Sequence, residues 1–182
     1  MEKFLEFLRF EGCKYEIKDG AVIVLDRLAP VKVRFKNIVI PENTDFKGGL
    51  DLEDYKGEIQ IPENLKVALL LNLENTNTKR LSSNLTIYNR CSVYLDAHNI
   101  ENVSYHDNCG LHDRTIFAFW ANNDFLIAAG CFVGTYQNFS IATNIKYDHN
   151  SAIKYKRQAR NCISELAKKL GKPDPFKKVT AN

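Results

Sequence analysis

The stretch IPENLKVALLLNLENT, residues 61–76, decides the fold. Its first four residues repeat the earlier Ile40-Pro41-Glu42-Asn43, and they return in degenerate form as Leu81-Ser82-Ser83-Asn84. Ten and twelve residues into each copy stand two apolar residues separated by one other, namely Leu50-Asp51-Leu52, Leu71-Asn72-Leu73 and Cys91-Ser92-Val93. A looser fourth copy is expected at Val31-Lys32-Val33. The shared phase of the two features predicts stacked coils of about 20 residues each.

Each coil is predicted to contain a short strand, because alternation of apolar and polar residues points two apolar side chains to one face. A single coil cannot bury that face, so neighbouring coils must stack and join their strands into a parallel sheet. The competing interpretation is a chance repetition within an antiparallel β-domain. Agreement in register between the Ile-Pro-Glu-Asn motif and the apolar pairs favours the solenoid.

Residues 40–104 resemble the short Leu-Pro-x-x-Leu class of bacterial leucine-rich repeat and small phage-encoded leucine-rich proteins. The resemblance implies an α/β fold with a short leucine-rich-repeat-like parallel β-solenoid. Bacterial effectors with such repeats often carry a ubiquitin-ligase domain whose catalytic element is Cys-x-Asp. Ligase activity is not implied here, because the residues two positions after the cysteines are Tyr15, Val93, Leu111, Val133 and Ser164.

The pattern changes after the repeats. Residues 115–120 and 125–129 are rich in residues that favour strands, and they predict a β-hairpin with residues 121–124 as a four-residue loop. Thr135 is expected to cap a short helix that ends near Thr143. Residues 127–135, with the helix that trails them, are similar to the C-terminal module of uncharacterised phage and prophage proteins.

The final helix is predicted from Ser151 to Leu170, with Asn150 or Ser151 as the N-cap and Gly171 as the stop. Residues at helical spacing form its expected apolar face, namely Ile153, Ala159, Cys162, Ile163, Leu166 and Leu170. The domain boundary is expected near residue 104. Residues 1–104 would then form an N-terminal cap and solenoid, and residues 105–182 a hairpin with a basic helical module.

Charge divides the chain unevenly. Residues 151–182 contain nine Lys and Arg against two acidic residues, a net +7, and the whole chain carries +3, which leaves −4 for the first 150 residues. The acidic part and the basic end therefore present opposite fields.

The N-terminus alternates charged and apolar residues, which is not the pattern of a signal peptide. No apolar run approaches the roughly 20 residues of a membrane span. Five widely spaced cysteines do not resemble a disulfide framework. These features predict a soluble protein of the host-cell cytoplasm that makes no contact with membrane.

His106, Cys109 and His112 stand at three-residue intervals, with His98 eight residues upstream of His106. Histidine and cysteine bind zinc at such spacing, yet zinc sites usually contain paired ligands that are absent here. The competing interpretation is a linker in which Asn, Asp and Gly make turns. The metal site is the less favoured of the two, no cofactor is predicted, and no motif for phosphate binding or cysteine catalysis is present.

The favoured function is therefore non-enzymatic protein binding. The resemblance suggests a phage or mobile-element protein that inhibits a host or defence-system protein by occluding its surface, a role comparable to anti-CRISPR counter-defence. The alternative is a nucleic-acid-associated regulator that uses the basic C-terminal helix. The predicted contact residues are Tyr55, Tyr88, Tyr94, Lys154, Arg157 and Arg160, although Tyr88 and Tyr94 could instead pack in the core.

Overall fold

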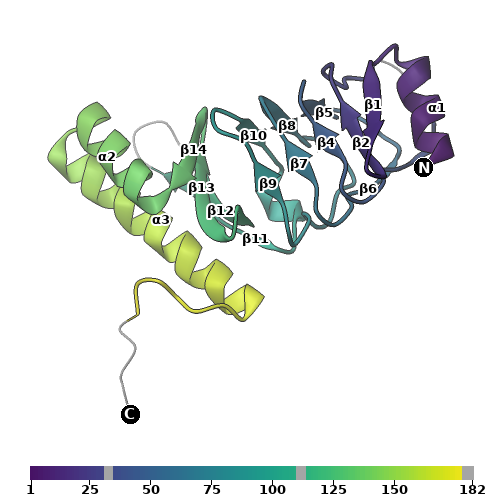
Figure 1. Cartoon of the computed structure of the whole chain (residues 1–182). Coiled ribbons are helices and arrows are strands. Elements are labelled where there is room, and N and C mark those ends of the chain that lie inside the picture. The colour runs from purple at the N-terminus through teal and green to yellow at the C-terminus, as the bar shows by residue number, and fades with distance from the viewer. Residues whose placement is uncertain (31–34, 110–113, 178–182) are drawn as a thin grey trace. The chain divides into compact units, whose positions relative to one another are not determined.

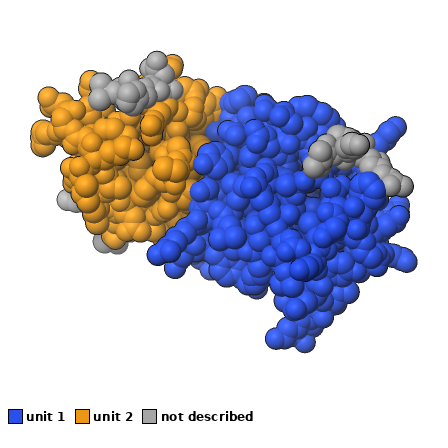
Figure 2. Space-filling model, turned by 90° about the horizontal axis from the view of Figure 1, so that it is seen from above, with its two compact units in different colours: residues 1–100, 121–123 blue, residues 101–120, 124–182 orange. Residues whose placement is uncertain are grey.

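The computed structural model describes residues 1–30, 35–109 and 114–177, which form two compact units. The first unit contains residues 1–100 and 121–123, and the second contains residues 101–120 and 124–182 (Figure 2).

The first unit is a parallel β-solenoid (Figure 1). Its helical elements are α1 (Glu2–Phe10) and the short 3-10 helix η1 (Ala97–Asn99). Its strands are β1 (Tyr15–Lys18), β2 (Ala21–Val24), β3 (Asn37–Val39), β4 (Asp45–Phe46), β5 (Leu50–Asp51), β6 (Glu58–Gln60), β7 (Lys66–Val67), β8 (Leu70–Asn72), β9 (Thr86–Ile87) and β10 (Ser92–Tyr94).

These strands lie in three sheets, in the orders β1-β2-β4-β7-β9, β10-β8-β5 and β3-β6. All pairings are parallel except that of β1 with β2. The solenoid predicted from the repeat is confirmed, but a coil contributes strands to more than one sheet, where the sequence pattern had indicated one strand per coil. Short strands on several faces share one core because every coil turns its apolar residues toward the axis.

The register of the last coil differs from the sequence alignment. In one sheet Leu50 pairs with Leu71, and Leu71 pairs in turn with Val93. In the neighbouring sheet Val67 pairs with Ile87. The turn from Ile87 to Val93 is therefore two residues longer than its counterpart from Val67 to Leu71, so Val93 and not Cys91 aligns with Leu71.

The looser copy of the repeat at residues 31–33 lies outside the described residues. The residue that bridges to Leu50 from the preceding coil is Leu28, which is fully buried. The described part of the chain thus places Leu28, Leu50, Leu71 and Val93 in successive coils.

Helix α1 closes the N-terminal end of the solenoid core. Phe4, Phe7 and Leu8 are buried on one side of the helix. The ring of Phe4 packs edge-on against Phe46 of β4, with 6.4 Å between the ring centroids. An end coil lacks a neighbour to cover its apolar residues, so this amphipathic helix supplies the cover.

The second unit is an antiparallel sheet in the order β11-β12-β13-β14, packed with two helices. Its elements are β11 (Val103–Cys109), β12 (Arg114–Ala121), β13 (Asp124–Ala129), β14 (Phe132–Thr135), α2 (Tyr136–Lys146) and α3 (His149–Leu170). Its core joins the inner faces of β12 and β13 to α2 and α3, and contains among others Ile116, Phe125, Ile127, Phe139, Tyr155 and Leu166.

Two expectations for this unit were wrong in detail. The hairpin loop has two residues rather than four, because Asn122 and Asn123 both adopt positive φ angles of 55° and 57°, the backbone of a tight hairpin turn. Residues 106–109, which were expected to lie in a linker, instead lie in β11, where His106 pairs with Ile116 of β12. A strand rich in Asp, Asn and His is hard to recognise from sequence, since these residues favour turns.

The hairpin tip belongs to the first unit. The main-chain N–H of Asn122 donates to the carbonyl of Leu85 at 2.9 Å, and its side-chain amide exchanges two hydrogen bonds with the main chain of Ile87 at 2.8 and 2.9 Å. The hairpin tip therefore forms hydrogen bonds with the outer edge of β9, the last strand of its sheet.

Candidate binding surfaces

Helix α3 is fixed at both ends by residues suited to those positions. Asp148 is the N-cap, and its carboxylate accepts hydrogen bonds from the main-chain N–H groups of Asn150 and Ser151 at 3.0 and 3.1 Å. A hydrogen bond from the Ser151 hydroxyl, together with these main-chain bonds, lowers the pKa of Asp148. Gly171 ends the helix in the left-handed conformation at φ 63°. The helix therefore begins slightly before the predicted Ser151 and ends where predicted.

The inner side of α3 is buried against the sheet. Tyr155, Ala159, Cys162, Ile163 and Leu166 are each at most 2% exposed. Ile153 was expected on this side but is 45% exposed, and Tyr155 is buried in its place. Because the apolar residues fix the rotation of the helix, the opposite side is directed to solvent.

The side of α3 that faces away from the core is cationic. Lys154, Arg157, Asn161 and Lys168 are exposed and lie at spacings of three, four and seven residues, which places them on one side of the helix. We call these four residues the cationic face. At a rise of 1.5 Å per residue, Lys154 and Lys168 are about 21 Å apart along the axis. Within the described residues, neither Lys154 nor Arg157 forms an ion pair.

The acidic residue within α3 is turned toward the sheet. Glu165 accepts a hydrogen bond from the hydroxyl of Ser104 at 2.8 Å and lies 3.4 Å from Nε2 of His106. Lys169, one turn further on, donates to the carbonyl of Val103 at 2.7 Å. Both side chains thus hold α3 to β11. None of the four residues of the cationic face is acidic, and the neighbouring Glu165, whose side chain is 51% exposed, is engaged with Ser104 and His106.

Arg160 has a structural contact that the sequence did not reveal. Its guanidinium lies 5.5 Å from the ring centroid of Tyr136 and 5.0 Å from that of Phe176. The two rings contact each other edge-on at 4.8 Å. Arg160 is exposed, as predicted, but it also fixes the segment after α3 against α2 by cation–π contacts.

The three predicted tyrosines lie in the first unit and differ in burial. Tyr55 is 3% exposed and its hydroxyl donates to the carbonyl of Phe35, so it offers a partner no surface. Tyr88 is half-buried, and its hydroxyl donates to the carboxylate of Asp45 at 2.9 Å while it accepts from Lys47 at 2.7 Å. Tyr94 is half-buried in β10. The cationic face and these tyrosines belong to different units.

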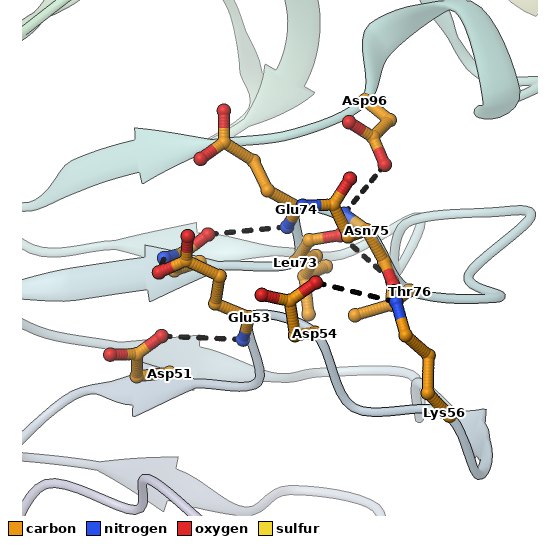
Figure 3. Close-up of polar contacts among 10 residues, drawn as sticks. Asp51, Glu53, Asp54, Lys56, Leu73, Glu74, Asn75, Thr76 and Asp96 are labelled. Atoms are coloured by element: carbon orange, nitrogen blue, oxygen red, sulfur yellow. Dashed lines mark hydrogen bonds and ion pairs between the residues drawn. The ribbon is translucent and has the colours of Figure 1, made fainter.

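Acidic residues project from successive coils of the solenoid (Figure 3). The carboxylate of Asp51 accepts a hydrogen bond from the main-chain N–H of Glu53 at 3.3 Å. One coil later, the side-chain oxygen of Asn72 accepts a hydrogen bond from the main-chain N–H of Glu74 at 3.2 Å. Asp96 accepts from the main-chain N–H of Asn75 at 2.7 Å. We call Glu53, Asp54, Glu74 and Asp96 the acidic ledge.

Stacking places like charges of the acidic ledge near one another. Burial raises the pKa of Glu74, and the negative charges of Glu53 and Asp96 raise it further. A raised pKa in the folded state means that folding favours the protonated carboxyl of Glu74 over the ionised one, compared with the unfolded chain. The stabilising contribution of the protonated Glu74 carboxyl is fully present below its ordinary pKa of 4.5. It is lost as the pH rises through the higher pKa of the folded protein.

We therefore expect Glu74→Gln to raise the melting temperature at pH 7, and the gain to vanish well below pH 4.5, where Glu74 is protonated in both the folded and the unfolded state. Thermal unfolding followed by circular dichroism across this range checks the result. A variant with the same gain at both pH values would contradict the electrostatic cause.

Glu63 provides the matched control, because its pKa is lowered chiefly by the hydroxyl of Ser83, which donates at 2.5 Å. A lowered folded pKa contributes stability above the ordinary value of 4.5 that is lost as the pH falls. Glu63→Gln should therefore destabilise the protein at pH 7 by less than about 1 kcal/mol, since the carboxylate is exposed, and should have no effect in acid. At pH 7, Glu74→Gln is thus expected to increase the stability of the protein and Glu63→Gln to decrease it.

The predicted metal ligands do not form a metal site in the described part of the chain. Cys109 is fully buried, and its thiol donates to the carbonyls of His106 and Asp107 at 3.1 and 3.6 Å, while burial raises its pKa. His98 is exposed at η1, and His112 lies outside the described residues. Among the residues that the structure describes, no group of three or more His, Cys, Asp or Glu side chains is arranged to hold a metal ion.

None of the described helices has the length and apolarity needed to cross a membrane. All five cysteines are free thiols, four of them buried and Cys131 exposed. In comparisons with known proteins, no family model, curated protein or solved structure matches the chain.

Proposed function

We propose that this protein is a non-enzymatic binding protein that engages an acidic surface of a partner protein through the cationic face of α3. The observation that supports the proposal is the arrangement of Lys154, Arg157 and Lys168 on the exposed side of one rigid helix, with the carboxylate of Glu165 engaged by Ser104 of β11. Cations held on a rigid element attract an acidic partner and fix its orientation at small entropic cost.

A protein is favoured over nucleic acid because the aromatic rings near α3 are already stacked on neighbours. Tyr147 stacks on Tyr155 with 4.6 Å between the centroids, and Tyr136 and Phe176 contact each other and Arg160. Proteins that bind single-stranded nucleic acid without sequence preference offer rings on which bases can stack. The rings named here are engaged within the second unit.

The consequence for the partner would be occlusion. A rod about 21 Å long, measured from Lys154 to Lys168, and about 10–12 Å wide supplies part of a standard interface, in which each partner loses roughly 800 Å² of accessible surface. A partner whose acidic surface binds substrate or another protein would be inhibited. Inhibition of a host or defence-system protein, and an origin in a phage or mobile element, stay predictions from the resemblance of the sequence.

Capture from cell lysate tests the proposal. The full chain, immobilised by its N-terminus, should retain a stoichiometric acidic protein that survives nuclease treatment and is released as the salt concentration rises, because screening weakens exposed charge pairs. Mass spectrometry identifies what is bound. If nuclease abolishes all capture, the ligand is nucleic acid and the proposal is wrong.

A further inference from the structure

The second unit contains a cavity that the proposed binding surface does not use. Its volume on the scale used for protein cavities is about 70 Å³, and it opens to solvent among β12, the turn from β13 to β14, α2 and the inner side of α3. Its walls are mainly apolar and include Ala129, Phe132, Phe139, Ala142, Tyr147 and Tyr155. Sites for small organic ligands are lined mostly by apolar and aromatic side chains.

The charged side chains that line this cavity are both cationic, namely Arg114 and Lys146. Arg114 is the first residue of β12 and is half-buried. Its guanidinium lies beside Gly130, with Nη1 3.4 Å from the point where a Cβ atom on that glycine would be. Lys146 is exposed at the end of α2. Within the described residues, neither forms an ion pair, and none of the lining residues is acidic.

Thr143 and Cys131 also line the cavity, and neither adds a negative charge that would repel an anionic ligand. The hydroxyl of Thr143 donates to the carbonyl of Ser140 at 3.0 Å, so its hydrogen is already used. Cys131 supplies an exposed free thiol. The ammonium of Lys146 lies 5.6 Å from the ring centroid of Tyr147, which also lines the cavity. An apolar, ring-lined cavity whose described lining contains two cations and no carboxylate complements a ligand that has an apolar body and a negative end.

We propose that this cavity binds a small organic anion, an aromatic or aliphatic carboxylate or sulfonate. One end of the apolar body enters the cavity and contacts Phe132, Phe139 and Tyr147, and the rest lies across the open mouth. The anionic group pairs with Arg114 and Lys146. Burial of the body supplies most of the affinity, and the cations select for negative charge. This site is separate from the cationic face, which lies on the other side of α3.

The probe is 8-anilinonaphthalene-1-sulfonate, whose fluorescence rises in apolar surroundings. We expect saturable binding of one molecule per chain. The uncharged analogue N-phenyl-1-naphthylamine, which lacks the sulfonate, should bind at least about tenfold more weakly, because it cannot pair with the cations. Arg114→Met with Lys146→Met should reduce sulfonate binding to the level of the neutral analogue. Lys154→Met with Arg157→Met, which removes the same charge from the cationic face, should leave binding unchanged.

A second measurement uses the unaltered protein and so does not depend on a variant that folds. Cys131 is the exposed cysteine, so iodoacetamide should label it before the four buried thiols. Saturating 8-anilinonaphthalene-1-sulfonate should slow this labelling several-fold, since the thiol lines the occupied cavity. Equal labelling rates with and without the probe, equal affinity for the charged and neutral probes, or loss of binding in the Lys154 and Arg157 control would each overturn the proposal.

Discussion

Leu71→Ala lowers the free energy of unfolding by about 2–5 kcal/mol, the range for a large-to-small change that leaves a cavity in a packed core. Leu71 is fully buried in β8, between its pairing partners Leu50 and Val93. A solenoid is stabilised by contacts between neighbouring coils, so a cavity at a middle coil weakens its interfaces with the coils on both sides. Equilibrium urea unfolding followed by circular dichroism measures the change.

Leu69→Ala is the matched control, because it makes the same substitution two residues away at a side chain that is 59% exposed. Leu69 has a positive φ angle of 62°, but alanine carries the same Cβ atom, so the substitution leaves the backbone strain unchanged. Its effect should stay within about 0.5 kcal/mol, the usual range for surface changes. If the two variants lose equal stability, Leu71 does not lie in the core and the register of the solenoid is wrong.

Reversal of charge on the cationic face has the second large effect. Lys154→Glu with Arg157→Glu should weaken capture of the partner at least about 100-fold, or roughly 2.7 kcal/mol, because like charges brought together in an interface cost several kcal/mol. Both side chains are exposed and form no ion pair within the described residues, so the fold should be unchanged. The affinity for the captured protein is measured by calorimetry.

Arg160 is left out of that variant, because its contacts with Tyr136 and Phe176 would confuse loss of binding with loss of structure. Lys18→Glu with Lys66→Glu is the charge-matched control, since both lysines are exposed on the solenoid. It changes the net charge by the same amount and should bind the partner nearly normally. Equal weakening by both variants would mean that net charge, and not the cationic face, attracts the partner.

The repeat could be recognised from sequence because the same short motif recurs in phase with buried apolar residues. The register of the last coil could not, because a strand has a period of two. The two extra residues before β10 leave Cys91 and Val93 both pointing inward, and both are buried. An alignment based on alternation therefore accepts either residue as the partner of Leu71.

Helix α3 was predicted well because its apolar residues, its glycine stop and its length all agree. The rotation of the helix was less certain from sequence, since Ile153 and Tyr155 are both apolar enough for the core. Packing against β12 and β13 buries Tyr155 and exposes Ile153. The exposure of Lys154 and Arg157 was predicted correctly because it follows from the charged positions alone.

The cavity could not have been predicted from the sequence. Arg114 and Lys146 stand far apart in the chain and at the ends of different elements. They line one cavity only because α2 packs on β13 and β14, in the sheet that also contains β12. Likewise, the role of Glu165 depends on Ser104 and His106, which lie in a strand that the sequence did not indicate.

The most direct test of the central claim is site-specific photo-crosslinking in lysate treated with nuclease. The photoreactive residue p-benzoylphenylalanine replaces Asn161 in the middle of the cationic face, or Lys18 on the exposed part of β1 as the comparison. A discrete protein adduct from position 161, absent from position 18, is the predicted result. An adduct from position 18 alone would contradict the account, because the partner would then bind the solenoid and not α3.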